Sequence, residues 1–320
     1  MPEWNDGIAK IVIPTPFPVG DVNVYAVKGE RLTLVDAGPR TEAAWEALKS
    51  QLKELGLSPS DIEQVVLTHH HPDHAGLLDF FPDSLEVYGH HLNQRWLVRT
   101  DEFLKEHDDF YYDLFPKCGI PEKYFPFIEL QKKSLKFSCS RPLTGILAEG
   151  DHPQGLEQWT VFETPGHAQS HIGLLRESDG VYIGGDHLLA HISPNPLIEP
   201  PLPGTTKRPK PQVQYNESLR KLKKLPIRLV YSGHGEDIFD AGKLIDKRLS
   251  RQHDRAMQVK NMLKTEGALS VFEICKRLFP AVYERELSLT ISETIAQLDY
   301  LNALGEISIN KDGSAFLFSA

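Results

Sequence analysis

Four histidines and a carboxylate lie within seven residues, in the segment Thr68-His69-His70-His71-Pro72-Asp73-His74. Neutral imidazole nitrogens and carboxylate oxygens are ligands that divalent transition metals bind in proteins. Taken alone, the segment also fits a solvated, histidine-rich loop. His69 and His71 can point the same way from an extended backbone, and Asp73 and His74 follow a proline that turns the chain. One short loop can thus offer ligands to two metal ions.

Three more potential ligands recur further along the chain in matching settings. Each follows a short apolar, strand-like run and is flanked by glycine, which permits tight backbone: His167 after residues 159–164, Asp186 after 181–183 and His234 after 228–231. A single His or Asp in such a turn is usually only a turn residue. Three in order after the histidine cluster indicate one shared site.

The elements upstream are those of a layered α/β protein. Residues 31–38 predict a buried strand that ends in a turn, and residues 41–55 predict a helix that Gly56 stops. Residues 62–67 form another apolar, β-branched run, so the histidine cluster lies just past the end of a strand. Loops at such strand ends are where ligand sites gather.

Together these motifs resemble those of the metallo-β-lactamase-fold hydrolases, over the first three quarters of the sequence. The resemblance implies an α/β, four-layered αββα sandwich with the site at one edge of its two sheets. It implies a first metal bound by His69, His71 and His167, a second bound by Asp73, His74 and His234, and Asp186 as the bridge between them. The ligand set is most similar to that of the glyoxalase II and RNase Z type.

This ligand set predicts hydrolysis by a hydroxide that bridges two divalent metals. Zinc suits His and carboxylate ligands, and manganese and iron also accept them. Asp73 is the predicted catalytic residue, because it would both bind metal and orient the attacking water. The sequence has no Gly-x-Ser-x-Gly nucleophile elbow and no Walker-type phosphate loop.

Four further residues near the motifs have less certain roles. We expect His70 to lie outside the ligand set and His171 to brace its own loop. His187, directly after Asp186, fits a pocket contact and plain packing equally well. Asp36 fits either support of the metal site or a simple turn.

Length and composition favour a packed cytoplasmic enzyme that acts on a small molecule. The chain has 320 residues, which suggests two domains, with 40% hydrophobic and 25% charged residues. The net charge of −9 argues against a surface that seeks nucleic acid in general. No 18-residue apolar stretch and no secretory signal is visible, and the three cysteines are too few for a disulfide framework. We therefore expect no membrane association.

Residues 1–240 are predicted to form the catalytic domain, with a helical insertion at about 92–135. The insertion is rich in aromatic residues, and we hypothesise that it caps the metal edge, with Tyr111 or Tyr112 as candidates to touch substrate. The proline-rich stretch that ends at Pro211 is expected to be an extended loop at the pocket rim.

Residues 241–320 predict helices at 241–264, 271–279 and 288–304, followed by a hairpin. This order resembles a winged-helix domain and the tail of the β-lactamase-like-protein-2 type of the superfamily. DNA binding is unlikely, because the candidate recognition helix 288–304 has no Lys or Arg, and the region has eleven basic against ten acidic residues. We expect a packing module or a homodimer contact instead.

Three functions remain open. A hydrolase of a small thioester, ester or lactone fits the acidic surface and the aromatic cap. A phosphodiesterase or endoribonuclease on single-stranded RNA fits the ligand set and the tail but not the charge. A binding module that holds metal without turnover fits least, because the ligand set includes Asp73.

Overall fold

The computed structural model describes residues 2–320. A first sheet has seven strands in chain order, antiparallel up to β4 and parallel from there on: β1 (Trp4–Asn5), β2 (Ile8–Ile13), β3 (Val22–Val27), β4 (Thr33–Val35), β5 (Gln64–Leu67), β6 (Glu86–Gly89) and β7 (Gly145–Ile146). A second sheet has the order β11-β10-β9-β8: β8 (Trp159–Glu163), β9 (Ile172–Arg176), β10 (Val181–Gly185) and β11 (Leu229–Ser232).

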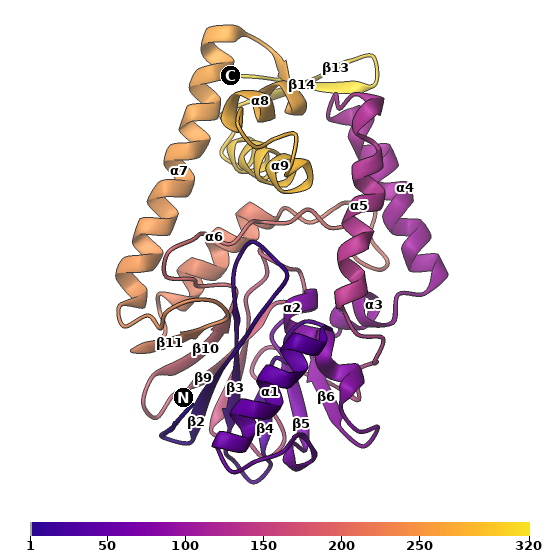
Figure 1. Cartoon of the computed structure of the whole chain (residues 1–320). Helices are drawn as coiled ribbons and strands as arrows, with labels where there is room; N and C mark the ends of the chain where they lie inside the picture. The colour runs from indigo at the N-terminus through magenta and orange to yellow at the C-terminus, as the bar shows by residue number, and fades with distance from the viewer. Residues whose placement is uncertain (1) are drawn as a thin grey trace.

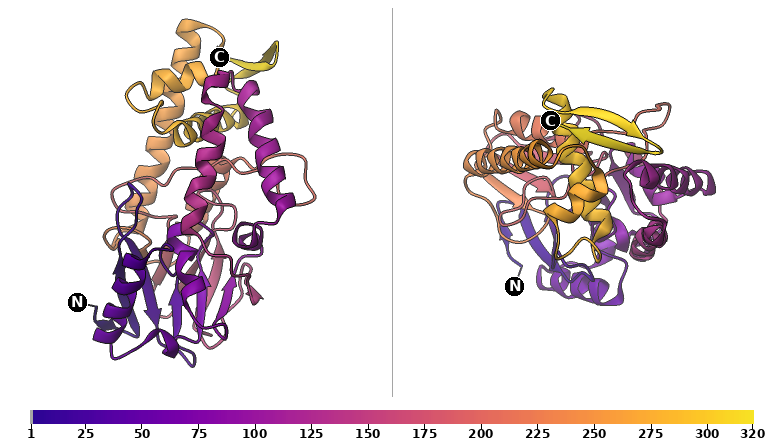
Figure 2. Two further views of the ribbon diagram at one scale, coloured as in Figure 1. Left: turned by 45° about the vertical axis from the view of Figure 1, so that its right-hand side comes forward. Right: turned by 90° about the horizontal axis from the view of Figure 1, so that it is seen from above.

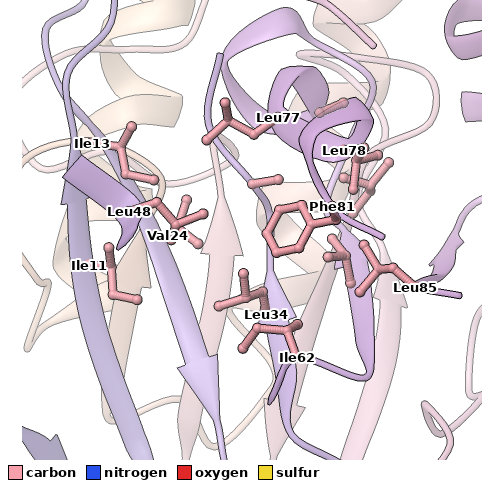
Figure 3. Packing of buried hydrophobic residues seen from close by; sticks show 14 of the residues in the cluster. Ile11, Ile13, Val24, Leu34, Leu48, Ile62, Leu77, Leu78, Phe81 and Leu85 are labelled. Atoms are coloured by element: carbon pink, nitrogen blue, oxygen red, sulfur yellow. The ribbon is translucent and has the colours of Figure 1, made fainter. Parts of the chain in front are cut away.

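The first sheet is covered on both faces, so its central strands β3, β4 and β5 are buried along their whole length. All six residues of β3 are buried. Val24 and Ala26 belong to the hydrophobic cluster beneath helix α1 (Glu42–Glu54), and Figure 3 shows part of this packing. Tyr25 and Val27 point the other way, into the cluster between the two sheets.

The second sheet repeats this arrangement. Trp159, Val161 and Ile183 meet the first sheet. Leu175 and Tyr182 pack instead against helix α6 (Pro211–Leu222) and the first half of α7 (Ala241–Glu266). The layers are therefore helix, sheet, sheet and helix, which confirms the predicted αββα sandwich (Figure 1).

A second body rises above one end of this sandwich (Figures 1 and 2). Between β6 and β7 the chain forms α3 (Asn93–Val98), α4 (Asp101–Lys117) and α5 (Pro126–Lys133). After α7 come β12 (Leu269–Ser270), α8 (Val271–Leu278), α9 (Leu287–Ala303), β13 (Ser308–Asp312) and β14 (Ala315–Ser319). The three short strands pair in the order β12-β14-β13.

One hydrophobic cluster joins these two stretches of chain. Phe115 from α4 and Ile128 from α5 pack in the same cluster as Leu263 from α7, Ile274 from α8 and Ile295 from α9. We call α3–α5 and residues 256–320 together the helical unit. The boundary at residue 240 and the winged-helix character of the tail stay predictions.

Most expected elements are confirmed, with bounds shifted by a few residues. The Thr41 side chain accepts a hydrogen bond from the Ala44 amide at the start of α1, and Gly56 has a φ of +77° just past its end. Strands β2 and β3 and helix α6 were not among the elements predicted from the sequence. Within residues 2–320, no helix combines the length and apolar character that a membrane span requires.

Candidate metal centre

All seven predicted ligands meet at one edge of the sandwich. The histidine cluster follows β5 and leads into the short helix α2 (Pro72–Ala75), and the other three ligands follow β8, β10 and β11. Their ligand atoms form three overlapping groups, each within 4.8 Å: His69, His71 and His167; His69, His74 and Asp186; and Asp73, His74 and His234. We call this the metal edge.

The first group converges on ring nitrogens. His69 Nε2 and His71 Nδ1 lie 2.9 Å apart, and the His69 and His167 rings have centroids 5.1 Å apart. His167 Nε2 lies 3.6 Å from Asp186 Oδ2. Three nitrogens thus face one small volume, as a tetrahedral metal ion with one open position requires.

Asp73, His74 and His234, which we call the second group from here on, also lie close to Asp186. His74 Nε2 lies 3.3 Å from Asp186 Oδ1, and His234 Nε2 lies 3.5 Å from Asp186 Oδ2. His234 Nε2 also lies 3.4 Å from Asp73 Oδ2. Asp186 therefore stands between the two groups, where a bridging carboxylate would stand.

Contacts behind the rings set which nitrogen faces the site. His167 Nδ1 lies 2.9 Å from the Asn195 carbonyl oxygen, and His234 Nδ1 lies 2.7 Å from that of Asp21. A carbonyl only accepts hydrogen bonds, so both rings carry hydrogen on Nδ1, and each ring in its neutral form presents the Nε2 lone pair to the site.

Several of these atoms are buried without a hydrogen-bond partner. Nε2 of His74, His167 and His234 and Oδ1 of Asp186 make no hydrogen bond with any residue that the structure describes. Leaving such atoms unpaired in the interior costs free energy. Because they converge on one place, bound cations are the partners that would satisfy all of them, and the donor set fits divalent metal.

The charges at the edge agree with this fit. Burial lowers the pKa of His69 and His71 well below the ordinary value, which keeps both rings neutral and ready to bind metal. Burial also opposes a charge on His234, but Asp186 and Asp73 outweigh it and raise its pKa to about 10. The carboxylates thus draw positive charge into this half of the site, which a divalent ion can supply.

Two positions beside the ligands are glycine because a larger side chain there would clash with its neighbours. A Cβ on Gly233 would lie 2.2 Å from Asp186 Oδ1. Gly185 has a φ of +46°, and a Cβ there would lie 2.7 Å from Thr68 Oγ1. A side chain at either position would displace Asp186 or the loop before the histidine cluster.

Two residues left open by the sequence support the metal edge. Asp36 Oδ2 lies 2.8 Å from His74 Nδ1, and its carboxylate also accepts hydrogen bonds from the amide and hydroxyl of Thr68. His171 braces its loop as expected, since its Nδ1 lies 2.7 Å from Thr164 Oγ1 and its Nε2 accepts from the Asp186 amide.

The other two histidines are not among the grouped ligands. His70 stacks on Trp96 with ring centroids 4.5 Å apart, and its Nδ1 lies 2.9 Å from Ser170 Oγ. His187 is fully buried and packs against Tyr215 at 4.7 Å, so the packing interpretation is the correct one.

A cavity of about 220 Å³ opens beside His71. Its walls come from the cap helices, the loop at 197–199 and helix α9. Tyr111 lines it, whereas Tyr112 is 45% exposed and is absent from its wall. Trp96 belongs to the aromatic insertion that was predicted to cap the metal edge, whereas Glu199 and Leu289 were not predicted to line a cavity. For Glu199, the one available signal was a lone glutamate in the apolar, proline-rich stretch.

Comparison with known proteins gives consistent results. Residues 17–234 match the model of the metallo-beta-lactamase superfamily. The chain is 46% identical over 313 residues to the probable metallo-hydrolase YqjP of Bacillus subtilis, covering 98% of both chains. It is 23% identical over 279 residues to a beta-lactamase-like protein 2 homolog of Caenorhabditis elegans, covering 86% of this chain and 77% of that one. The crystal structure of the metallo-beta-lactamase family protein TTHA1429 from Thermus thermophilus superposes with a TM-score of 0.80 and 29% identity, covering 98% of this chain and 99% of that one.

Proposed function

Because the chain belongs to the metallo-β-lactamase superfamily, we propose that its metal edge binds two divalent ions and hydrolyses a small thioester, ester or lactone. The observation that carries this proposal is the set of buried, unpartnered ligand atoms in two groups around Asp186. Zinc is our first choice of metal, because three or four nitrogen and oxygen ligands at one point suit it.

We propose that the ligands divide between the two ions as the resemblance implies. His69, His71 and His167 would hold one ion, Asp73, His74 and His234 would hold the other, and Asp186 would contact both. When bound, the two ions would polarise the substrate carbonyl and lower the pKa of the attacking water.

The protein's own residues orient the attacking water and hold the histidine rings in one orientation. Asp73 is the acidic residue of the second group besides Asp186, so its carboxylate can accept a hydrogen bond from the attacking water and aim it. Asp36 fixes the His74 ring, and two backbone carbonyls fix the rings of His167 and His234. The site is thus organised before substrate arrives. Such preorganisation is the main source of electrostatic catalysis, because the polar groups need not reorient during the reaction.

The surroundings favour a carbonyl substrate over a polyanion. The cavity beside His71 presents mainly carbon surface, and the chain has a net charge of −9. On helix α9, Glu293 pairs with Arg255, and Asp299 pairs with Arg208. In the cavity wall itself, Lys132 is paired with Asp108 and Glu129, so little positive charge is left there for a phosphate backbone.

The test is turnover by the zinc- and manganese-loaded protein on two matched panels. One holds acyl-glutathione, acyl-CoA and lactone substrates, and the other holds bis(p-nitrophenyl) phosphate and a short single-stranded RNA. We expect activity only on the carbonyl panel. Cleavage confined to the phosphodiester panel would overturn the proposal in favour of the nuclease alternative. Absence of turnover on both panels would favour a metal-holding module.

A further inference from the structure

The proposed chemistry at the metal edge does not use the cavity beside His71. His71 belongs both to the first ligand group and to the cavity wall, so the cavity opens directly beside the proposed reaction centre. A substrate whose carbonyl lies at the metal edge would extend its remaining atoms into this space.

Several polar atoms of the wall are paired with one another. The Tyr111 hydroxyl donates to the Ile198 carbonyl at 2.6 Å, and the Ile198 amide donates to Ser292 Oγ at 3.3 Å. Trp96 Nε1 donates to Glu199 Oε2 at 3.3 Å. These pairs leave mainly carbon surface facing the cavity, so an apolar group would gain most from binding there.

Lys132 does not change this character. Its Nζ lies 2.7 Å from Asp108 and 3.1 Å from Glu129, so its charge is already balanced. A substrate carboxylate or phosphate would have to compete with two existing partners for it.

The wall facing the cap comes from the C-terminal part of the chain. Leu289 on α9 lines the cavity, yet it is 43% exposed. Its carbonyl accepts a hydrogen bond from Asn195 Nδ2, which holds α9 against the loop at the rim. An apolar side chain fixed in place with this much uncovered surface is well suited to pack on an apolar ligand.

We infer that this cavity binds the apolar acyl group of the substrate, and that Leu289 of α9 limits the length of the chain it accepts. The inference rests on the proposed function, because the acyl carbonyl is taken to lie at the metal edge. An apolar cavity of about 150 Å³ holds benzene, so this one has room for a chain of roughly six to eight carbons.

The first experiment compares straight-chain acyl thioesters from acetyl to decanoyl on the metal-loaded protein. Each methylene that enters the cavity should raise kcat/KM by about fourfold until the cavity is full. Leu289→Trp fills part of the space, so the ratio of octanoyl to acetyl kcat/KM should fall at least about tenfold. Leu304→Trp, at an exposed leucine at the end of α9 outside the cavity wall, is the matched control and should keep the wild-type ratio.

A second variant and a second measurement separate the possible failures. Leu197→Trp narrows the cavity from the loop side, so it should shift the chain-length profile even if Leu289→Trp misfolds. Binding of the neutral probe 1-octanol, measured by calorimetry on the metal-loaded protein, needs no hydrolysis.

Together, these measurements distinguish failure of the acyl-group site from failure of the proposed function. Octanol binding that Leu289→Trp or Leu197→Trp weakens, in a protein that hydrolyses no thioester, ester or lactone, would support the apolar site and overturn the proposed function. Turnover with a flat chain-length profile and no octanol binding would support the proposed function and overturn the acyl-group site.

Discussion

At the metal edge, the proposed ligands follow the ends of strands or lie in α2, whereas the cavity wall draws its residues from helices and a loop far apart in the chain. The edge is held by a buried polar network that includes Asp36, Thr68 and His171. The helical unit is held by apolar packing in one cluster. In the proposed function, the metal edge would carry the chemistry, which tolerates little geometric change. The cavity wall would set the fit of the substrate, which apolar packing can alter gradually.

The sharpest way to test this separation is to remove a ligand from the metal edge alone. Asp73→Ala should lower kcat/KM by at least about 1,000-fold, because metal binding and water orientation are lost together. The thermal midpoint should stay close to that of the wild type loaded with the same metal. Asp83→Ala, at a fully exposed aspartate, is the control and should retain full activity. Retained turnover in Asp73→Ala would remove Asp73 from the mechanism.

Arg248 tests whether helix α7 holds the loop that follows Asp186 at the metal edge. This buried guanidinium on α7 donates to the carbonyls of Leu189 and Ile192, in the loop that follows Asp186. Arg248→Gln should lower the free energy of unfolding by about 3 kcal/mol, since hydrogen bonds to a charged group are lost in the interior.

Urea denaturation measures this change. Arg251→Gln, at an exposed position on the same helix, should stay within about 0.5 kcal/mol of the wild type. Equal stability of the two variants would mean that α7 does not hold this loop.

Asp36 tests how far the edge relies on residues behind the ligands. Asp36→Asn removes the charge that faces His74 Nδ1, so metal affinity of the second group should fall by about 10- to 100-fold. Competition with a chelator of known affinity measures it, and the first group serves as the internal reference. A uniform loss at both metals would show that Asp36 supports the whole edge.

The smallest expected effect is the contribution of Glu199, in the cavity wall, to the pH dependence of stability. Burial raises its pKa to about 7, against an ordinary value of 4.5. The folded protein therefore holds a proton that the unfolded chain releases, and stability falls as pH rises from about 4.5 to 7. Between pH 5.5 and 7.5 the loss from this group should be about 2 kcal/mol.

Glu199→Gln cannot titrate, so the difference in unfolding free energy between it and the wild type should change across this pH range. Urea denaturation of the metal-free proteins at several pH values measures the difference. A difference that stays constant with pH would show that Glu199 is ionised throughout.

The metal edge was predictable from sequence because its chemistry demands particular residue types. Histidines two apart, an Asp-His pair and three Gly-flanked ligands at strand ends are local patterns, and the structure brings all seven together. The acceptors behind His167 and His234 were not predictable, because they are backbone carbonyls of Asn195 and Asp21, which any residue supplies.

The helical unit was predictable only in its parts. Its helices follow apolar spacing, but nothing local shows that Trp96, Glu199 and Leu289 face one cavity. Helix α6 was missed because Pro211, at its first position, ends a proline-rich stretch that predicts a loop. Strand β2 does carry the apolar, β-branched residues of a strand, so it could have been found.

Helix α7 bears on how the molecule can move. Its 26 residues span about 39 Å, and no proline interrupts them. Ile245 near one end is anchored in the cluster under the second sheet, and Leu263 near the other is anchored in the cluster of the helical unit. An uninterrupted helix anchored in both clusters fixes the distance between the sandwich and the helical unit. A hinge motion that moved the whole helical unit away to admit substrate would therefore require α7 to bend. Entry should instead depend on local shifts of side chains and of the loop at the rim.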